Sequence, residues 1–139
     1  MRTIRSTGSV RAAAGIAACT AAWLVACGVS NAGGAPSVSP NELLALRSET
    51  AAPLLLDVRT AQEFQGGHVP GAINVPHTEL TARLGEIEAA RESGIVVYCE
   101  SGRRAVAAAD VLVGAGFEDV RHLEGDMSGW RAAGLPVER

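Results

Sequence analysis

The stretch IVVYCESGRRAVAAADVLV, residues 95 to 113, joins an apolar run to a helical pattern through a short polar loop. The run 95–98 is continuously apolar rather than alternating, which is typical of a strand that is buried on both faces. Residues 103 to 114 predict a helix, which two glycines at positions 114 and 116 would end. A buried strand that leads directly into a helix is typical of an α/β fold.

The rest of the chain repeats this alternation. Apolar runs at 54–56, 72–75 and 120–123 predict further strands, and residues 78–92 predict a helix. Another helix is expected to begin at Ser39, where Ser-Pro-Asn-Glu provides an N-cap, a proline at the first helical position and a capping-box glutamate. Strands that alternate with helices predict a parallel sheet of about five strands with helices on both faces. We assign residues 38–139 to this one domain.

The first 26 residues have a different character. Residues 1–11 carry three arginines and no acid, and residues 12–26 are uncharged and mostly alanine. This pattern predicts a secretory signal peptide, since the apolar run is shorter than the roughly 20 residues that a membrane span needs. LVAC, residues 24–27, resembles the lipobox of bacterial lipoproteins, which are cleaved before the cysteine and lipidated on it.

On this resemblance, residues 1–26 are a lipoprotein signal peptide and Cys27 is lipidated. Residues 27–37, which are small, uncharged and rich in glycine, form a flexible tether. The chain is then exported and lipid-anchored on the outer side of a bacterial cytoplasmic or outer membrane. The alternative is a soluble exported protein with a free Cys27.

Processing would change both the thiol count and the charge. Cys19 would leave with the signal and Cys27 would carry lipid, so Cys99 would be the remaining thiol, and an odd cysteine in an exported protein indicates a reactive group. The processed chain would keep nine arginines, no lysine and fifteen acidic residues, which gives a net charge of −6. This acidity argues against nucleic acid as a partner. Three scattered histidines provide no metal-site spacing, so we predict neither metal nor cofactor.

Cys99 occupies a position suited to nucleophilic chemistry. It follows the carboxyl end of a predicted strand, where α/β sheets bind ligands. Backbone N–H groups of the loop, the positive end of the following helix and two guanidinium groups would all stabilise a thiolate. Glycine in this loop permits a backbone angle that a β-carbon would penalise. The predicted active-site loop comprises Glu100, Ser101, Gly102, Arg103 and Arg104, with the Glu100 side chain expected to face solvent. The alternative is that Cys99 is a small buried core residue.

Three segments resemble the successive signatures of the rhodanese homology domain. They are LLLDVRTAQEFQGGHVPGAINVPH (54–77), VVYCESGRRA (96–105) and HLEGDMSGW (122–130). The resemblance spans residues 38 to 137 and implies a five-stranded parallel sheet. It also implies that Cys99 accepts a sulfane sulfur as a persulfide, from a donor such as thiosulfate, and passes it to cyanide or a thiol. Asp126 departs from the usual LEGGMSGW, and we expect this change to affect local geometry rather than chemistry.

The resemblance also suggests roles for the basic residues. Arg103 and Arg104 are both predicted to bind the substrate; Arg104 is also expected to brace the loop and Arg103 to attract anionic donors. Arg59 either binds the donor in the pocket or forms a salt bridge with Asp57, which we expect to have a structural role. The histidines His68, His77 and His122 are expected at structural or surface positions.

Two other functions remain open. Phosphatases and arsenate reductases that resemble this fold use a seven-residue loop, whereas Cys99 to Arg104 spans six residues, which favours sulfur transfer. A non-catalytic module that binds a partner or carries sulfur is the second alternative. The retention of Cys99, Gly102 and Arg104 favours an enzyme. The sequence specifies neither the physiological donor and acceptor nor the oligomeric state.

Overall fold

The structure is a computed structural model of the 139-residue chain, and it describes residues 34–139. The predicted signal peptide (1–26), Cys27 and most of the predicted tether (27–37) lie outside the described residues. No helix within residues 34–139 is long and apolar enough to cross a membrane.

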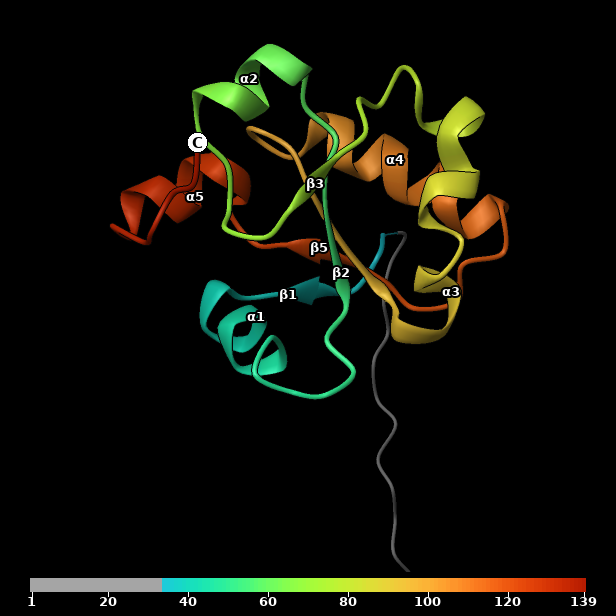
Figure 1. Cartoon of the computed structure of the whole chain (residues 1–139), viewed down its shortest axis with the longest axis horizontal. Coiled ribbons are helices and arrows are strands. Elements are labelled where there is room, and N and C mark those ends of the chain that lie inside the picture. Colours follow the sequence, from blue (N-terminus) through green and yellow to red (C-terminus); the bar gives the residue numbers. More distant parts are fainter. Residues whose placement is uncertain (1–33) are drawn as a thin grey trace, which may run out of the picture. The chain divides into compact units, whose positions relative to one another are not determined.

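The core of the fold is a five-stranded sheet in the order β1-β5-β4-β2-β3, in which every paired neighbour runs parallel (Figure 1). This confirms the predicted α/β class and strand count. The strands are β1 (Ser37–Val38), β2 (Leu54–Asp57), β3 (Ile73–Asn74), β4 (Ile95–Tyr98) and β5 (Val120–Leu123). All four residues of β4 are buried, as expected for the middle strand of the sheet. Cys99 therefore follows the carboxyl end of the central strand.

Helices cover both faces of this sheet. One face packs against η1 (Leu80–Ile87), α3 (Ala90–Ser93) and α4 (Arg103–Gly114), through a cluster that includes Ile95 and Val97. The other face packs against α1 (Pro40–Leu46), α2 (Ala61–Gly66) and α5 (Asp126–Ala132), through a cluster that includes Val96 and Tyr98. Alternate residues of β4 thus enter opposite cores, as the two-residue period of a strand requires.

Three local features differ from the sequence-based expectations. The helix predicted over residues 78–92 is instead a 3₁₀ helix, η1, followed by the single-turn helix α3. Gly85 lies in the middle of this segment, where glycine destabilises an α-helix. The sheet begins at Ser37, which pairs with His122. The seven-residue helix α5 was not predicted, and a glycine at position 129 weakens its helical pattern.

The predicted N-cap of α1 is confirmed. The Ser39 side chain accepts a hydrogen bond from the backbone N–H of Glu42, and the Glu42 carboxylate accepts one from the backbone N–H of Ser39. Helix α2 begins with a second capping box, formed by Thr60 and Glu63. This second box fixes a carboxylate that also reaches the candidate site.

A buried ion pair fixes the carboxyl end of β2. Asp57 is 0% exposed and Arg59 is 1% exposed, and Arg59 Nη2 lies 2.7 Å from Asp57 Oδ2. The same nitrogen donates to the carbonyl oxygen of Gly67 at 2.8 Å, and Nη1 lies 3.2 Å from Glu100 Oε2. Burial lowers the pKa of Arg59, but the hydrogen bond and the charge of Asp57, with the charges of Tyr98 and Glu100, together outweigh it, so the net shift is upward. One guanidinium therefore joins β2, the turn at residue 67 and the loop after β4.

We predict that Arg59→Ala lowers the free energy of unfolding by about 3–5 kcal/mol, because it leaves the Asp57 carboxylate buried without a cation. Urea denaturation followed by circular dichroism measures the loss. Arg83→Ala is the matched control, since Arg83 forms its ion pairs with Glu79 and Glu86 at the surface and its removal should cost far less. Equal losses in the two variants would show that the buried pair has no special structural role.

Candidate active site

Cys99 lines a surface pocket. The pocket is lined by His77, Cys99, Ser101, Arg103, Arg104 and Ala107. Cys99 itself is only 1% exposed and contacts the core beneath α4. Burial alone would fit the alternative of a packing cysteine. A place in a pocket beside two arginines instead suits a nucleophile that a small substrate can reach from one side.

The sulfur receives a hydrogen bond from its own loop. The backbone N–H of Gly102 donates to Cys99 Sγ at 3.1 Å. Gly102 has φ = +97°, a conformation that residues with a side chain rarely adopt. A β-carbon at position 102 would also lie 3.2 Å from Asp126 Oδ2. The predicted need for glycine in this loop is confirmed, because the backbone turn that aims the N–H at the sulfur depends on it.

Arg104 joins the start of α4 to α2. Its Nη1 and Nη2 atoms each lie 2.8 Å from a carboxylate oxygen of Glu63. The hydrogen bonds with Arg104 hold the pKa of Glu63 far below its usual range, although burial acts in the opposite direction. The backbone N–H and the hydroxyl of Thr60 also donate to this carboxylate, so both Thr60 and Arg104 fix the position of the Glu63 side chain. Arg104 therefore occupies the position that its predicted bracing role requires.

Arg103 is exposed at the pocket and has a different environment. Within residues 34–139, no acidic side chain forms an ion pair with it. Its positive charge at the pocket is therefore not neutralised by a direct partner. This environment suits the predicted role of attracting an anionic donor.

Arg59 and Glu100 occupy positions that differ from parts of the prediction. Arg59 does not line the pocket, because its guanidinium is buried against Asp57 and the carbonyl of Gly67. The salt bridge that the sequence offered as the alternative is thus present, and a role for Arg59 in donor binding stays a prediction that this geometry does not favour. Asp57 has the structural position that we expected.

Glu100 was expected to face solvent, and its side chain is 34% exposed and does not line the pocket, but it is held by partners rather than free. Its carboxylate accepts hydrogen bonds from Ser128 Oγ at 3.1 Å and Arg131 Nη1 at 2.5 Å, and it pairs with Arg59. Burial raises the pKa of Glu100, but the hydrogen bonds with Arg131 and Ser128 and the charges of Arg131 and Arg59 together outweigh it, and the net shift is downward. The charge that would oppose a thiolate is thus neutralised by two arginines.

Sequence reasoning did not identify a pair of residues that contacts the Cys99 loop. Asp126 is 4% exposed, and its Oδ1 accepts a hydrogen bond from the backbone N–H of Cys99 at 2.8 Å. Its two carboxylate oxygens lie 3.1 and 3.0 Å from His122 Nε2. The available signal was an aspartate in place of the usual glycine, four residues after a histidine. His77, expected at a structural or surface position, also lines the pocket.

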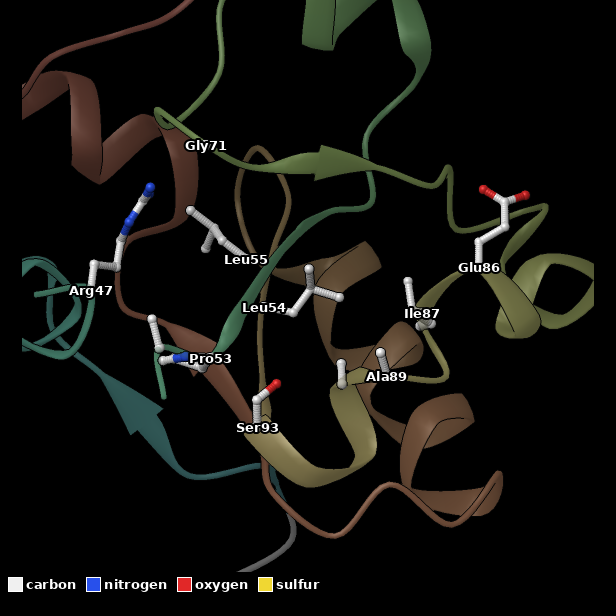
Figure 2. Close-up of a pocket in the computed structure, with 11 residues that line it drawn as sticks. Arg47, Pro53, Leu54, Leu55, Gly71, Glu86, Ile87, Ala89 and Ser93 are labelled. Carbon is white, nitrogen blue, oxygen red and sulfur yellow. The ribbon is translucent and has the colours of Figure 1, made fainter. Parts of the chain in front are cut away.

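A second pocket lies at the opposite, amino end of the strands (Figure 2). It is lined mostly by apolar and small residues around Pro53, Leu54, Ile87 and Ala89, and Arg47 and Glu86 lie at its margin. It contains no cysteine or histidine. The pocket above Cys99 is therefore the better candidate for chemistry. No group of three or more potential metal ligands gathers anywhere in residues 34–139.

Comparisons with known proteins agree with this geometry. The family model of the rhodanese-like domain matches residues 39–133. An HTH-type transcriptional regulator of Mycobacterium tuberculosis is 44% identical over 94 residues, which are 66% of this chain but only 40% of the regulator. A thiosulfate sulfurtransferase of Pseudomonas savastanoi pv. phaseolicola is 34% identical over 68% of this chain and 86% of the relative.

The same agreement extends to three-dimensional structure. The crystal structure of a thiosulfate sulfurtransferase from Pseudomonas aeruginosa superimposes with a TM-score of 0.68 at 31% identity, over 76% of this chain and 20% of that one. The chain thus spans well under half of some of the proteins it matches. The family model, however, covers most of the described residues, including the whole loop from Cys99 to Arg104. The chain belongs to the rhodanese-like domain family.

Proposed function

We propose that the chain is a sulfurtransferase that moves a sulfane sulfur from a donor such as thiosulfate to a thiol or to cyanide. The observation that carries the proposal is the environment of one atom. Cys99 Sγ accepts a hydrogen bond from the N–H of Gly102, and Cys99 lines a pocket together with Arg103 and Arg104. Relatives named thiosulfate sulfurtransferase support the same reaction class.

The proposed reaction has two balanced steps. The Cys99 thiolate attacks the outer sulfur of thiosulfate, a new S–S bond forms on Cys99, and the bond from that sulfur to the sulfite group breaks. Sulfite leaves with the electron pair of the broken bond, and Cys99 carries a persulfide anion. A thiolate or cyanide ion then attacks the outer sulfur and releases the Cys99 thiolate, which closes the cycle. No proton or external electron is required when all partners are anions.

The residues of the site fit both steps. Each step handles anions, and the Gly102 N–H and the two arginines lie where negative charge is present on the sulfur or the donor. The six-residue span from Cys99 to Arg104 suits a single added sulfur better than a tetrahedral phosphate or arsenate. A carrier module that holds sulfur without turnover is the remaining alternative, and because a carrier also needs a donor to reach the sulfur, turnover distinguishes the two.

We expect the chain to form thiocyanate from thiosulfate and cyanide, and Cys99→Ala to abolish this activity because no other group in the pocket can form a persulfide. Colorimetric thiocyanate measurement tests it. Mass spectrometry of the thiosulfate-treated chain should show one additional sulfur on the peptide that contains Cys99. Persulfide formation without thiocyanate release would favour the carrier alternative, and the absence of both would contradict the proposal.

Arg103 and Arg104 should affect different kinetic constants. Arg103→Ala removes an unpaired surface charge, so it should mainly raise KM for thiosulfate. Arg104→Ala releases the contact with Glu63 that braces the loop, so it should mainly lower kcat. Glu63→Gln is the matched control, because it weakens the same brace from the other side and should also lower kcat. Identical effects of Arg103→Ala and Arg104→Ala on KM and kcat would contradict these separate roles.

Export and lipid anchoring through Cys27 remain part of the proposal. They rest on the basic residues 1–11, the apolar residues 12–26 and the LVAC sequence at 24–27. A membrane-anchored enzyme of this kind would act on donors and acceptors outside the cytoplasm.

The corresponding prediction is that the mature chain begins at Cys27 and carries a diacylglycerol. Intact-mass measurement of protein extracted from the membrane fraction of the producing bacterium would show both changes. Cys27→Ser should leave the lipid mass absent and release the chain from the membrane fraction. A wild-type chain that still begins at Met1, or that begins later without added lipid, would contradict the anchor.

A further inference from the structure

A carboxylate lies against the nucleophile loop. Asp126 Oδ1 accepts the backbone N–H of Cys99 at 2.8 Å, and Oδ2 lies 3.2 Å from the point where a β-carbon of residue 102 would stand. The Asp126 carboxylate therefore contacts the loop at the nucleophile itself and lies next to Gly102, the residue that donates to its sulfur. A negative charge in this place opposes the thiolate, the persulfide and any anionic donor.

Asp126 adopts an unusual backbone conformation to reach this place. Its φ is +53°, and within residues 34–139 it is the one residue other than glycine with positive φ. Such strain persists only where surrounding contacts hold it, and here the carboxylate provides them through Cys99 and His122. The side chain of Asp126 is thus fixed against the loop rather than free to turn to solvent.

The charge of Asp126 has one direct counter-ion. His122, at the end of β5, places Nε2 at 3.0 Å from Oδ2 and is 22% exposed at its side chain. The other cations near the loop are engaged elsewhere or lie at the pocket mouth. Arg59 pairs with Asp57 and Glu100, Arg131 with Glu100, and Arg104 with Glu63, while Arg103 and His77 line the pocket. Whether the Asp126 charge is cancelled therefore depends on the proton of His122.

We propose that Asp126 and His122 are positioning residues for Cys99: Asp126 fixes the Cys99 amide, and the proton on His122 cancels the Asp126 charge beside the sulfur. The proposal rests on the proposed function only in assigning a purpose, namely the approach of an anionic sulfur donor. With His122 protonated the pair is neutral, and anions approach Cys99 freely. With His122 neutral the Asp126 carboxylate stands alone and repels them.

The direction of the pH dependence follows from His122. The hydrogen bond with Asp126 raises the pKa of His122 above 6.5, against the lowering effect of burial. The neutralised state is therefore complete below 6.5 and is lost as the pH rises through the raised value. The pKa values of Glu63 and Glu100 are lowered and those of Arg59 and Arg104 are raised, so these groups keep their charges in this range. His77 is the other histidine that faces the pocket.

The test compares an anionic and a neutral alkylating reagent on Cys99. Iodoacetate and iodoacetamide both react with the thiolate. The iodoacetate rate divided by the iodoacetamide rate is therefore independent of the fraction of Cys99 that is ionised, and it reports the charge near the sulfur. Both rates are measured on the full-length chain between about pH 6 and pH 9, a range that begins near the pKa of an ordinary histidine. Mass spectrometry of the peptide that contains Cys99 separates its reaction from those of Cys19 and Cys27. We expect the ratio to fall about threefold as His122 loses its proton, the effect of one charge about 6 Å away in a water-like medium.

Three variants distinguish the proposal from a merely structural role. His122→Gln retains a donor for Asp126 but has no titrating proton, so its ratio should be flat and as low as the wild-type value at high pH. Asp126→Asn retains an acceptor for the Cys99 N–H without the charge, so its ratio at high pH should exceed the wild-type value. In this variant the fall of the ratio that accompanies deprotonation of His122, which we call the step, should move to lower pH, because the carboxylate that raises the pKa of His122 is absent. The wild-type chain and the two other variants are also measured in a His77→Gln background, which removes the other histidine of the pocket, and the step should remain there as long as His122 is present.

The outcomes separate cleanly. A flat wild-type ratio, a step that persists in His122→Gln, or a step that disappears in His77→Gln would overturn the proposal. If one variant does not fold, as judged by circular dichroism, the wild-type profile and the other variants still decide. Alkylation requires neither sulfur donor nor acceptor. A chain without sulfurtransferase activity that still shows the step would contradict the proposed function alone, and an active chain without the step would contradict only the role of Asp126 and His122.

Discussion

The candidate site depends on the hydrogen bonds that hold the chain after β4 against α5. The N–H of Cys99 donates to Asp126 Oδ1, the N–H of Met127 to the carbonyl of Cys99, and the N–H of Ser128 to the carbonyl of Glu100. Backbone polar groups must find partners when they are buried. With these groups turned toward α5, the chain reverses at Gly102 and aims its N–H at the sulfur. The position of the nucleophile is thus set by a helix that begins 27 residues later.

The same site illustrates how an acidic chain provides a local cationic surface. Arg59 is neutralised by Asp57 in the interior, and Glu100 is neutralised by Arg59 and Arg131 at the side of the loop. These pairs keep the loop carboxylate away from the pocket lining. Two arginines then face the pocket, one braced by Glu63 and one without an acidic partner in the described chain. The chemistry of the pocket therefore depends on how charges are paired, and the net charge of −3 does not reveal it.

The features that could be predicted are those encoded over a few neighbouring residues. Local spacing or backbone sterics account for the buried run of β4, the cap of α1 and the requirement for glycine at position 102. The fold class and the nucleophile loop could therefore be predicted from the sequence. The partners of the loop were not, because Glu63 and Arg104 are separated by 41 positions and Asp126 and Cys99 by 27. The helix expected over 78–92 failed for a related reason. Its apolar spacing is helical, but packing against α4 tolerates a 3₁₀ helix with a glycine inside it.

Asp126 shows why a family signature locates a reactive group but does not describe its environment. A glycine at this position would relieve the positive φ of 53° but would have no atom to accept the N–H of Cys99. The aspartate introduces backbone strain but accepts a hydrogen bond from the Cys99 N–H. It also adds a negative charge, for which His122 is the direct partner. Expecting this substitution to affect geometry alone was therefore incomplete, because the geometry places a carboxylate at the reacting residue. In the proposed reaction, one such charge would act on the donor, the sulfur and the acceptor alike.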